Sequence, residues 1–316
     1  MRLRYTLRRM TRPIEGLKSE ALRAALQSAL QQPKGPAFAQ LQALLAKYGG
    51  LPSPHPNLKL AAAFGAEIAS AKGAALAVLT QLADDVAAPD TAQAFLPVAA
   101  AHGFTQRIRA GFEVEEGFAA LQRLAADERG IVRTGVLDAL ITLAARAGMA
   151  DELVNRADQW LDDADRELSY GSVASALAVV GDPRVLPSVH EHTRLLEVLT
   201  HTIDVVADAP RAASRSEGRR RVFRALAPML AHMIAALRGS QEVITWFSAE
   251  CQRAKHPDVR AMLSDALQRL PDVPNTPPRS LIDELRGALE GSQKPVRDHA
   301  RVRPGSGRGR RSRALR

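Results

Sequence analysis

The segment from 114 to 147 constrains the fold more than any other part of the chain. It reads as two short helices, over 115–126 and 131–146, joined by a tight turn. Apolar residues fall on one stripe of the first helix at Phe118, Leu121, Leu124 and Ala125. Such narrow stripes on short helices need neighbouring copies to cover their edges. Because the pattern recurs with drift along the chain, we predict an all-α stack of helical hairpins.

The turn of this unit has a specific spacing. Asp127 precedes the second helix, where a carboxylate can accept backbone N–H groups, and Val132 and Arg133 follow. This Asp-x-x-x-x-Val-Arg spacing resembles the HEAT-repeat family. The resemblance implies an α-solenoid in which Asp127 and Arg133 form a hydrogen-bonded ladder between repeats. It therefore assigns all three residues a structural role.

A second signature is the string Gly181-Asp182-Pro183-Arg184. Gly181 is expected to end one helix in a left-handed cap, and Asp182-Pro183 to start the next, a long helix over 186–206. The string resembles the turn between repeats of bacterial HEAT proteins related to phycobilisome lyases.

A compressed form of the signature stands at Pro257-Asp258-Val259-Arg260. Here the Asp is next to the Val, so no ladder role is expected for Asp258.

Composition supports helices and excludes several classes. Hydrophobic residues make up 46% of the chain but aromatic residues only 4%, which suits close-packed helices rather than a β-sandwich. Cys251 is the single cysteine, so no intrachain disulfide can form and a cytoplasmic location is predicted. No apolar run approaches the roughly 18 residues of a membrane span. The Arg-rich start lacks the apolar core of a secretory signal, although a transit-like start remains a minor alternative.

The pattern divides the chain into four parts. They are a basic N-terminal segment (1–13), a HEAT-like α-solenoid (14–270), a Pro-rich linker with a short helix (271–290) and a disordered Arg/Gly-rich tail (291–316).

Charge is concentrated at the two ends. The net charge is +9, of which residues 294–316 carry +8 and residues 1–12 carry +5, leaving −4 for the body between them. The solenoid is thus predicted to be mildly acidic, with basic ends.

The tail is the strongest candidate for nucleic-acid binding. Clustered arginines neutralise phosphates and release counterions, but no aromatic residue is interleaved to stack on bases. The alternatives are a solubilising tail and one that binds any acidic partner. A basic insertion around 208–221 extends the candidate set if it lies on the concave face; a solvated loop is the alternative. The candidates are Arg301, Arg303, Arg308, Arg310, Arg311, Arg313, Arg219, Arg220 and Arg221.

A metal site is not predicted. His190 and His192 flank Glu191 without forming an HExxH motif. His190 and His201 share a helix face in the predicted helix but lie about three turns apart, too far to chelate one ion. They are interpreted as surface histidines.

One group of residues is a candidate for an enzyme active site. Trp160 lies near Asp162, Asp163 and Asp165, and the HEAT-like DNA alkylation-repair glycosylases, a more distant resemblance, use aromatic and acidic groups on a concave surface. This chain has two Trp and three Tyr, against the aromatic richness of that family. Trp246-Phe247 is predicted to be core.

No phosphate loop, zinc spacing or nucleophile with plausible partners stands out, so no cofactor is expected. The sequence therefore predicts a non-enzymatic interaction scaffold. Protein partners would bind its concave face, and basic ends would add affinity for nucleic acid or acidic partners. The alternative is a DNA alkylation-repair protein of the glycosylase type.

Overall fold

The computed structural model describes residues 19–210, 213 and 215–291, and this part of the chain contains helices and no strand. The predicted all-α class is confirmed. The helices are α1 (Ser19–Gln31), α2 (Pro36–Tyr48), α3 (Leu58–Ile68), α4 (Ala75–Ala83), α5 (Phe95–Ala110), α6 (Val114–Ala126), α7 (Gly130–Ala144), α8 (Met149–Leu161), α9 (Arg166–Val180), α10 (His192–Ala207), α11 (Glu217–Ala236), α12 (Gln241–Arg253), α13 (Pro257–Arg269) and α14 (Arg279–Gly291).

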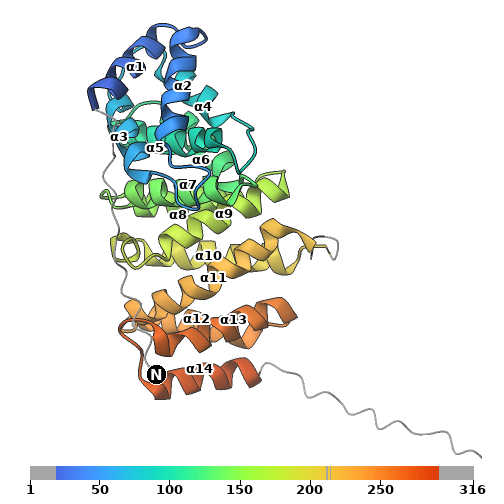
Figure 1. Ribbon diagram of the computed structural model, residues 1–316. Coiled ribbons are helices and arrows are strands. Elements are labelled where there is room, and N and C mark those ends of the chain that lie inside the picture. Colours follow the sequence, from blue (N-terminus) through green and yellow to red (C-terminus); the bar gives the residue numbers. More distant parts are fainter. Residues whose placement is uncertain (1–18, 211–212, 214, 292–316) are drawn as a thin grey trace, which may run out of the picture.

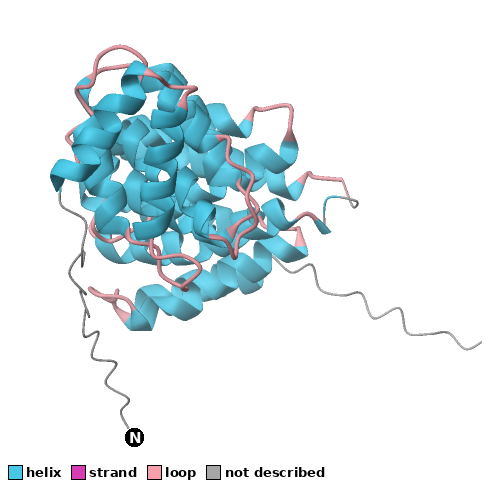
Figure 2. Cartoon of the chain, turned by 45° about the horizontal axis from the view of Figure 1, so that its top comes forward, coloured by secondary structure: helices cyan, strands magenta, loops and turns pink. Residues whose placement is uncertain are grey.

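The helices are stacked along one axis, from α1 at one end to α14 at the other (Figure 1). From α3 onward, each odd-numbered helix packs against the next odd-numbered helix, as far as α13. The even-numbered helices α4 to α14 form a second row beside them. Figure 2, a view turned by 45°, shows the same helices with their connecting loops.

The apolar stripes place the helices as the sequence predicts. Both helices of the central unit, α6 and α7, begin and end within about two residues of their predicted limits. Val132 is fully buried on α7. The first turn of α12 is capped by Ser240, whose side chain accepts the N–H of Val243.

One glycine lets two helices of the stack approach closely. A Cβ atom on Gly65 of α3 would lie 2.7 Å from the carbonyl oxygen of His102 on α5. Because that neighbour is backbone, only the missing side chain allows this spacing. The α3–α5 contact is accordingly among the most extensive in the molecule.

Two helices of the odd-numbered row are covered on nearly all sides. Every residue of α5 is buried except Gln106, Arg109 and Ala110. On α9, burial extends from Ser169 to Val180 with only Ala178 exposed. The concave face expected on a solenoid is therefore not open at these two helices.

The turn after α9 differs from its prediction. Gly181 has φ −77°, so it does not form a left-handed cap. Its small size serves packing instead, since a Cβ there would lie 2.6 Å from the Cβ of Met229.

The long helix predicted over 186–206 is also wrong in its first part. A 3₁₀ turn at Leu186–Ser188 precedes α10, which begins only at His192. Asp151 of α8 accepts the backbone N–H groups of His190 and Glu191, at 2.8 and 3.1 Å. These bonds hold the chain against α8 just before the helix starts.

The predicted basic insertion is shorter than expected. Ser216 caps α11 by accepting the N–H of Arg219, so Arg219, Arg220 and Arg221 lie in the first turns of a helix rather than in a loop. At the other end, α14 packs against α12 and α13 and so continues the stack beyond residue 270.

Candidate binding surfaces

The turn between α6 and α7 is closed by a local ion pair. Asp127 Oδ1 accepts the backbone N–H of Arg129 at 2.8 Å and its Nε at 2.9 Å, while Oδ2 accepts Nη2 at 2.7 Å. Arg133 instead donates to the carbonyls of Asp127 and Glu128, at 2.6 and 2.7 Å. The expected Asp127–Arg133 ladder is wrong, because the nearer Arg129 occupies the carboxylate.

The bond across units comes from Arg129. Its Nη1 donates to the carbonyl of Ala87, in the loop after α4, at 2.9 Å. The same local ring recurs after α9, where Asp182 accepts the N–H and Nε of Arg184, each at 2.9 Å. The hydrogen bond from Arg184 lowers the pKa of Asp182 below its ordinary value. An Asp-x-Arg turn is thus a repeated structural element of this chain.

Replacing Arg129 with Ala is expected to lower the free energy of unfolding by about 1–2 kcal/mol, because the bond to Ala87 and the ring with Asp127 are both lost. Arg184→Ala is the matched control, since it loses the same ring in a more exposed position. Urea denaturation of both variants measures the difference. Equal losses would show that the bond to Ala87 contributes nothing.

Asp258 does link neighbouring units, contrary to its prediction. Its Oδ2 accepts Nη1 of Arg219 at 2.9 Å, joining α13 to α11. The Arg219 side chain is only 4% exposed, and its Nε donates to the carbonyl of Val206. Arg219 is therefore a buried structural residue and is not available to a nucleic-acid phosphate.

The other predicted nucleic-acid residues fall into three settings. Arg220 is exposed and pairs with Glu217, whereas Arg221 is half-buried. The tail residues lie outside the described part of the chain, so the structure does not place them. They are Arg301, Arg303, Arg308, Arg310, Arg311 and Arg313.

The histidine and tryptophan candidates are separated by the fold. His190 precedes α10 while His201 lies within it. No group of three or more His, Cys, Asp or Glu side chains in the described ranges is arranged to hold a metal ion. Trp160 is 4% exposed, so it cannot stack on a base in the way that the glycosylase alternative requires.

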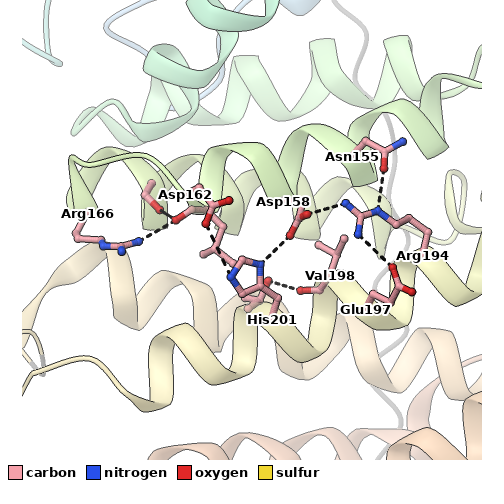
Figure 3. A network of polar contacts seen from close by, with 11 residues as sticks. Asn155, Asp158, Asp162, Arg166, Arg194, Glu197, Val198 and His201 are labelled. Atoms are coloured by element: carbon pink, nitrogen blue, oxygen red, sulfur yellow. Dashed lines mark hydrogen bonds and ion pairs between the residues drawn. The ribbon is translucent and has the colours of Figure 1, made fainter.

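A polar network joins α8 to α10 (Figure 3). Asp158 Oδ1 lies 2.8 Å from His201 Nδ1, and its Oδ2 accepts Arg194 Nη2 at 2.6 Å. Arg194 also donates to Asn155 at 3.0 Å and to Glu197 at 3.2 Å. Burial raises the pKa of Asp158, but the hydrogen bonds from His201 and Arg194 outweigh it and hold the pKa below its ordinary value. The network fixes α10 against α8.

A groove of about 790 Å³ lies between α10 and α12, and Glu197 and His201 of the polar network also line it. These two helices contact each other at few residues, whereas α10 packs closely on α8. Leu196 and Trp246 provide its apolar surface. The Trp246 indole N–H donates to Thr200 Oγ1 at 2.8 Å, which fixes the ring across the groove. Glu197, Asp204 and Glu242 also line it.

Trp246 was predicted to be core together with Phe247, and the structure separates the two. Phe247 is fully buried, while Trp246 is half-buried and faces the groove. Polar residues precede Trp246 at Gln241, Glu242 and Thr245. That polar surrounding was the available signal that one aromatic ring stays near the surface.

A second cleft, of about 990 Å³, opens where the α6–α7 turn meets the start of α11. We call it the arginine cleft, after its lining residues Arg123, Arg129, Arg133, Arg215 and Arg221. The body was predicted to be mildly acidic, and this cluster of cations was not expected because its arginines come from segments far apart in the chain.

Two further observations bear on what this protein is. None of the described helices has the length and apolarity needed to cross a membrane. A scan against protein-family models finds no match, and a search of curated proteins finds no similar sequence.

Proposed function

We propose that this protein is a non-enzymatic, HEAT-like interaction scaffold that holds a protein partner in the groove between α10 and α12. The groove itself carries the proposal, because it combines an apolar surface at Leu196 and Trp246 with carboxylates. We infer a cytoplasmic location from the single, buried cysteine Cys251.

The chemistry of the groove suggests the partner. Leu196 and Trp246 offer an apolar surface on which an aliphatic or aromatic anchor can pack. Glu242 adds a carboxylate with which no cation of the described residues pairs, whereas Glu197 and Asp204 pair with Arg194 and Arg253. A short amphipathic helix or extended segment with one apolar anchor and flanking Lys or Arg residues matches both features.

The chain's own rigidity favours such a role. The Asp158–Arg194–His201 network holds α10 from the α8 side, and Arg253 pairs with Asp204 at 2.6 Å from the α12 side. Walls fixed in this way lose little side-chain entropy when a partner binds. The basic ends would add salt-dependent, non-specific affinity for nucleic acid or acidic partners.

Thr245→Arg tests the groove directly. Thr245 is exposed on α12 and lines the groove, so a long cation there should block an apolar anchor. Thr134→Arg, at an exposed position on α7 outside the groove, is the matched control. Each tagged protein is used for affinity purification from the cells that produce it, and the captured partner is then titrated in purified form.

The wild-type protein and Thr134→Arg should retain the same partner, and Thr245→Arg should bind it at least about tenfold more weakly, since roughly 1.4 kcal/mol is lost when one anchor is blocked. Equal affinity of all three proteins for every captured partner would rule out the groove as the binding site.

A further inference from the structure

Three arginines of the arginine cleft form no ion pair among the described residues: Arg133, Arg221 and the exposed Arg215. Of these, Arg133 lies on α7 and Arg221 on α11. The other cleft arginines on helices or their turns are compensated: Arg129 pairs with Asp127 and Arg123 with Asp84.

Both guanidinium groups are held by neutral backbone oxygens. Arg133 Nη1 donates to the carbonyls of Asp127 and Glu128. Arg221 Nη2 donates to the carbonyls of Ala125 and Gly171, at 2.8 and 3.1 Å. These bonds fix the position of each group without neutralising its charge. A fixed, uncompensated pair of guanidiniums is the arrangement that binds oxyanions tightly.

The two charges also repel each other. Burial first, and then the nearby Arg133, lower the pKa of Arg221 to about 10, while Glu217 and Glu167 raise it. Arg221 therefore stays charged at neutral pH in a half-buried position next to a second cation. An anion placed between them would remove this repulsion.

The acidic residues of the cleft are turned to other partners. Asp127 pairs with Arg129, and Glu217 pairs with Arg220 and Arg224. Glu167 accepts the backbone N–H of Gly218 at 3.2 Å. Glu128 is exposed at the rim. They leave room for one anionic group at the arginine pair, but they would repel the successive phosphates of a nucleic acid.

We propose that Arg133 and Arg221 bind the phosphate group of a phosphate monoester in the arginine cleft. A monoester dianion carries up to two negative charges, which match the two guanidiniums, and each guanidinium can donate to two of its oxygens. The cleft volume of about 990 Å³ accommodates a ligand much larger than phosphate alone. Exposed Val86 and the following Ala87–Pro89 line the same cleft and offer an apolar wall for the remainder of the ligand.

This site is separate from the α10–α12 groove, so a negative result for phosphate binding would leave the scaffold proposal intact. The phosphate group could belong to a phosphorylated side chain of a protein or to a small phosphorylated metabolite. Both sources present the same chemistry to the arginine pair, and the experiment distinguishes them.

The test uses the full-length chain and inorganic phosphate as the first probe. Calorimetric titration at constant ionic strength compares the wild type with Arg133→Met, Arg221→Met and Arg224→Met. Arg224 is the matched control, since it is exposed on the same helix as Arg221 and lies outside the cleft. A thermal melt of each variant shows whether it is folded. Wild type and Arg224→Met should bind phosphate equally, and each cleft variant about tenfold more weakly or not at all.

Two further probes assign the source. A phosphoserine peptide that binds more tightly than its unphosphorylated form, and loses this advantage in Arg221→Met, supports a phosphorylated protein. Adenosine monophosphate binding more tightly than phosphate, with the same loss, supports a metabolite. Phosphate binding that is absent, or unchanged in folded Arg133→Met and Arg221→Met, overturns the site. Duplex DNA that depends on Arg221 more strongly than either probe overturns the choice of a monoester.

Discussion

Replacing Arg219 with Ala is expected to lower the free energy of unfolding by about 3 kcal/mol. The substitution removes the ion pair between α11 and α13, leaves the carbonyl of Val206 without its donor and opens a space beside Phe223, over whose ring the guanidinium lies at 4.9 Å. Asp258→Asn should also destabilise, since it leaves a buried guanidinium without its counter-charge. Denaturant unfolding followed by circular dichroism measures both changes.

Arg220→Ala is the control for this prediction. Arg220 is the next residue on α11 and carries the same charge, but it is exposed, so its loss should change stability by less than about 0.5 kcal/mol. Comparable losses for the two variants would contradict the buried role of Arg219. A folded Arg219→Ala protein with selectively weakened DNA binding would restore the nucleic-acid interpretation of this residue.

Removing residues 294–316 is expected to weaken binding to DNA and RNA by at least about 100-fold at 50 mM salt. This segment carries a net charge of +8, while the body from 13 to 293 carries −4. Each phosphate neutralised contributes a slope of about −0.9 to the logarithmic dependence of affinity on salt for duplex DNA. Fluorescence anisotropy at 50 and 200 mM salt, with and without the segment, measures both the affinity and the slope.

A scrambled tail of the same composition is the control for the truncation. It should bind as the wild-type tail does, because counterion release depends on charge and not on sequence order. Unchanged affinity after truncation would refute a role of the tail in nucleic-acid binding. A scrambled tail that fails to bind would instead indicate sequence-specific recognition.

The positions of helices were largely predictable because they depend on local patterns. The start of α9 is an example, where Asp165 accepts the N–H groups of Glu167 and Leu168, as an Asp just before a helix commonly does. The start of α10 was not predictable, because the backbone before it is held by Asp151 of α8, which accepts the N–H of His190.

The candidate surfaces depend on contacts that no local pattern encodes. Asp127 and Arg133 matched a family spacing, yet the carboxylate is occupied by Arg129. The charge of Arg219 suggested an exposed cation, and only the packing of α11 against α13 shows that it is buried. The groove at Trp246 likewise arises from the spacing of α10 and α12. The HEAT resemblance remains a prediction that no similar protein tests.

The bond from Arg221 to the carbonyl of Ala125 spans 96 residues and joins α11 to the end of α6. In the order of the chain, the hairpin of α8 and α9 lies between the two helices that this bond joins. In an idealised array each module interacts with its two neighbours alone, so modules can be duplicated or excised and the ends rejoin. Here the modules on either side of the α8–α9 hairpin are also joined to each other directly, by the hydrogen bond from Arg221 to Ala125. Recombination could therefore lengthen this protein at its ends more readily than at its centre.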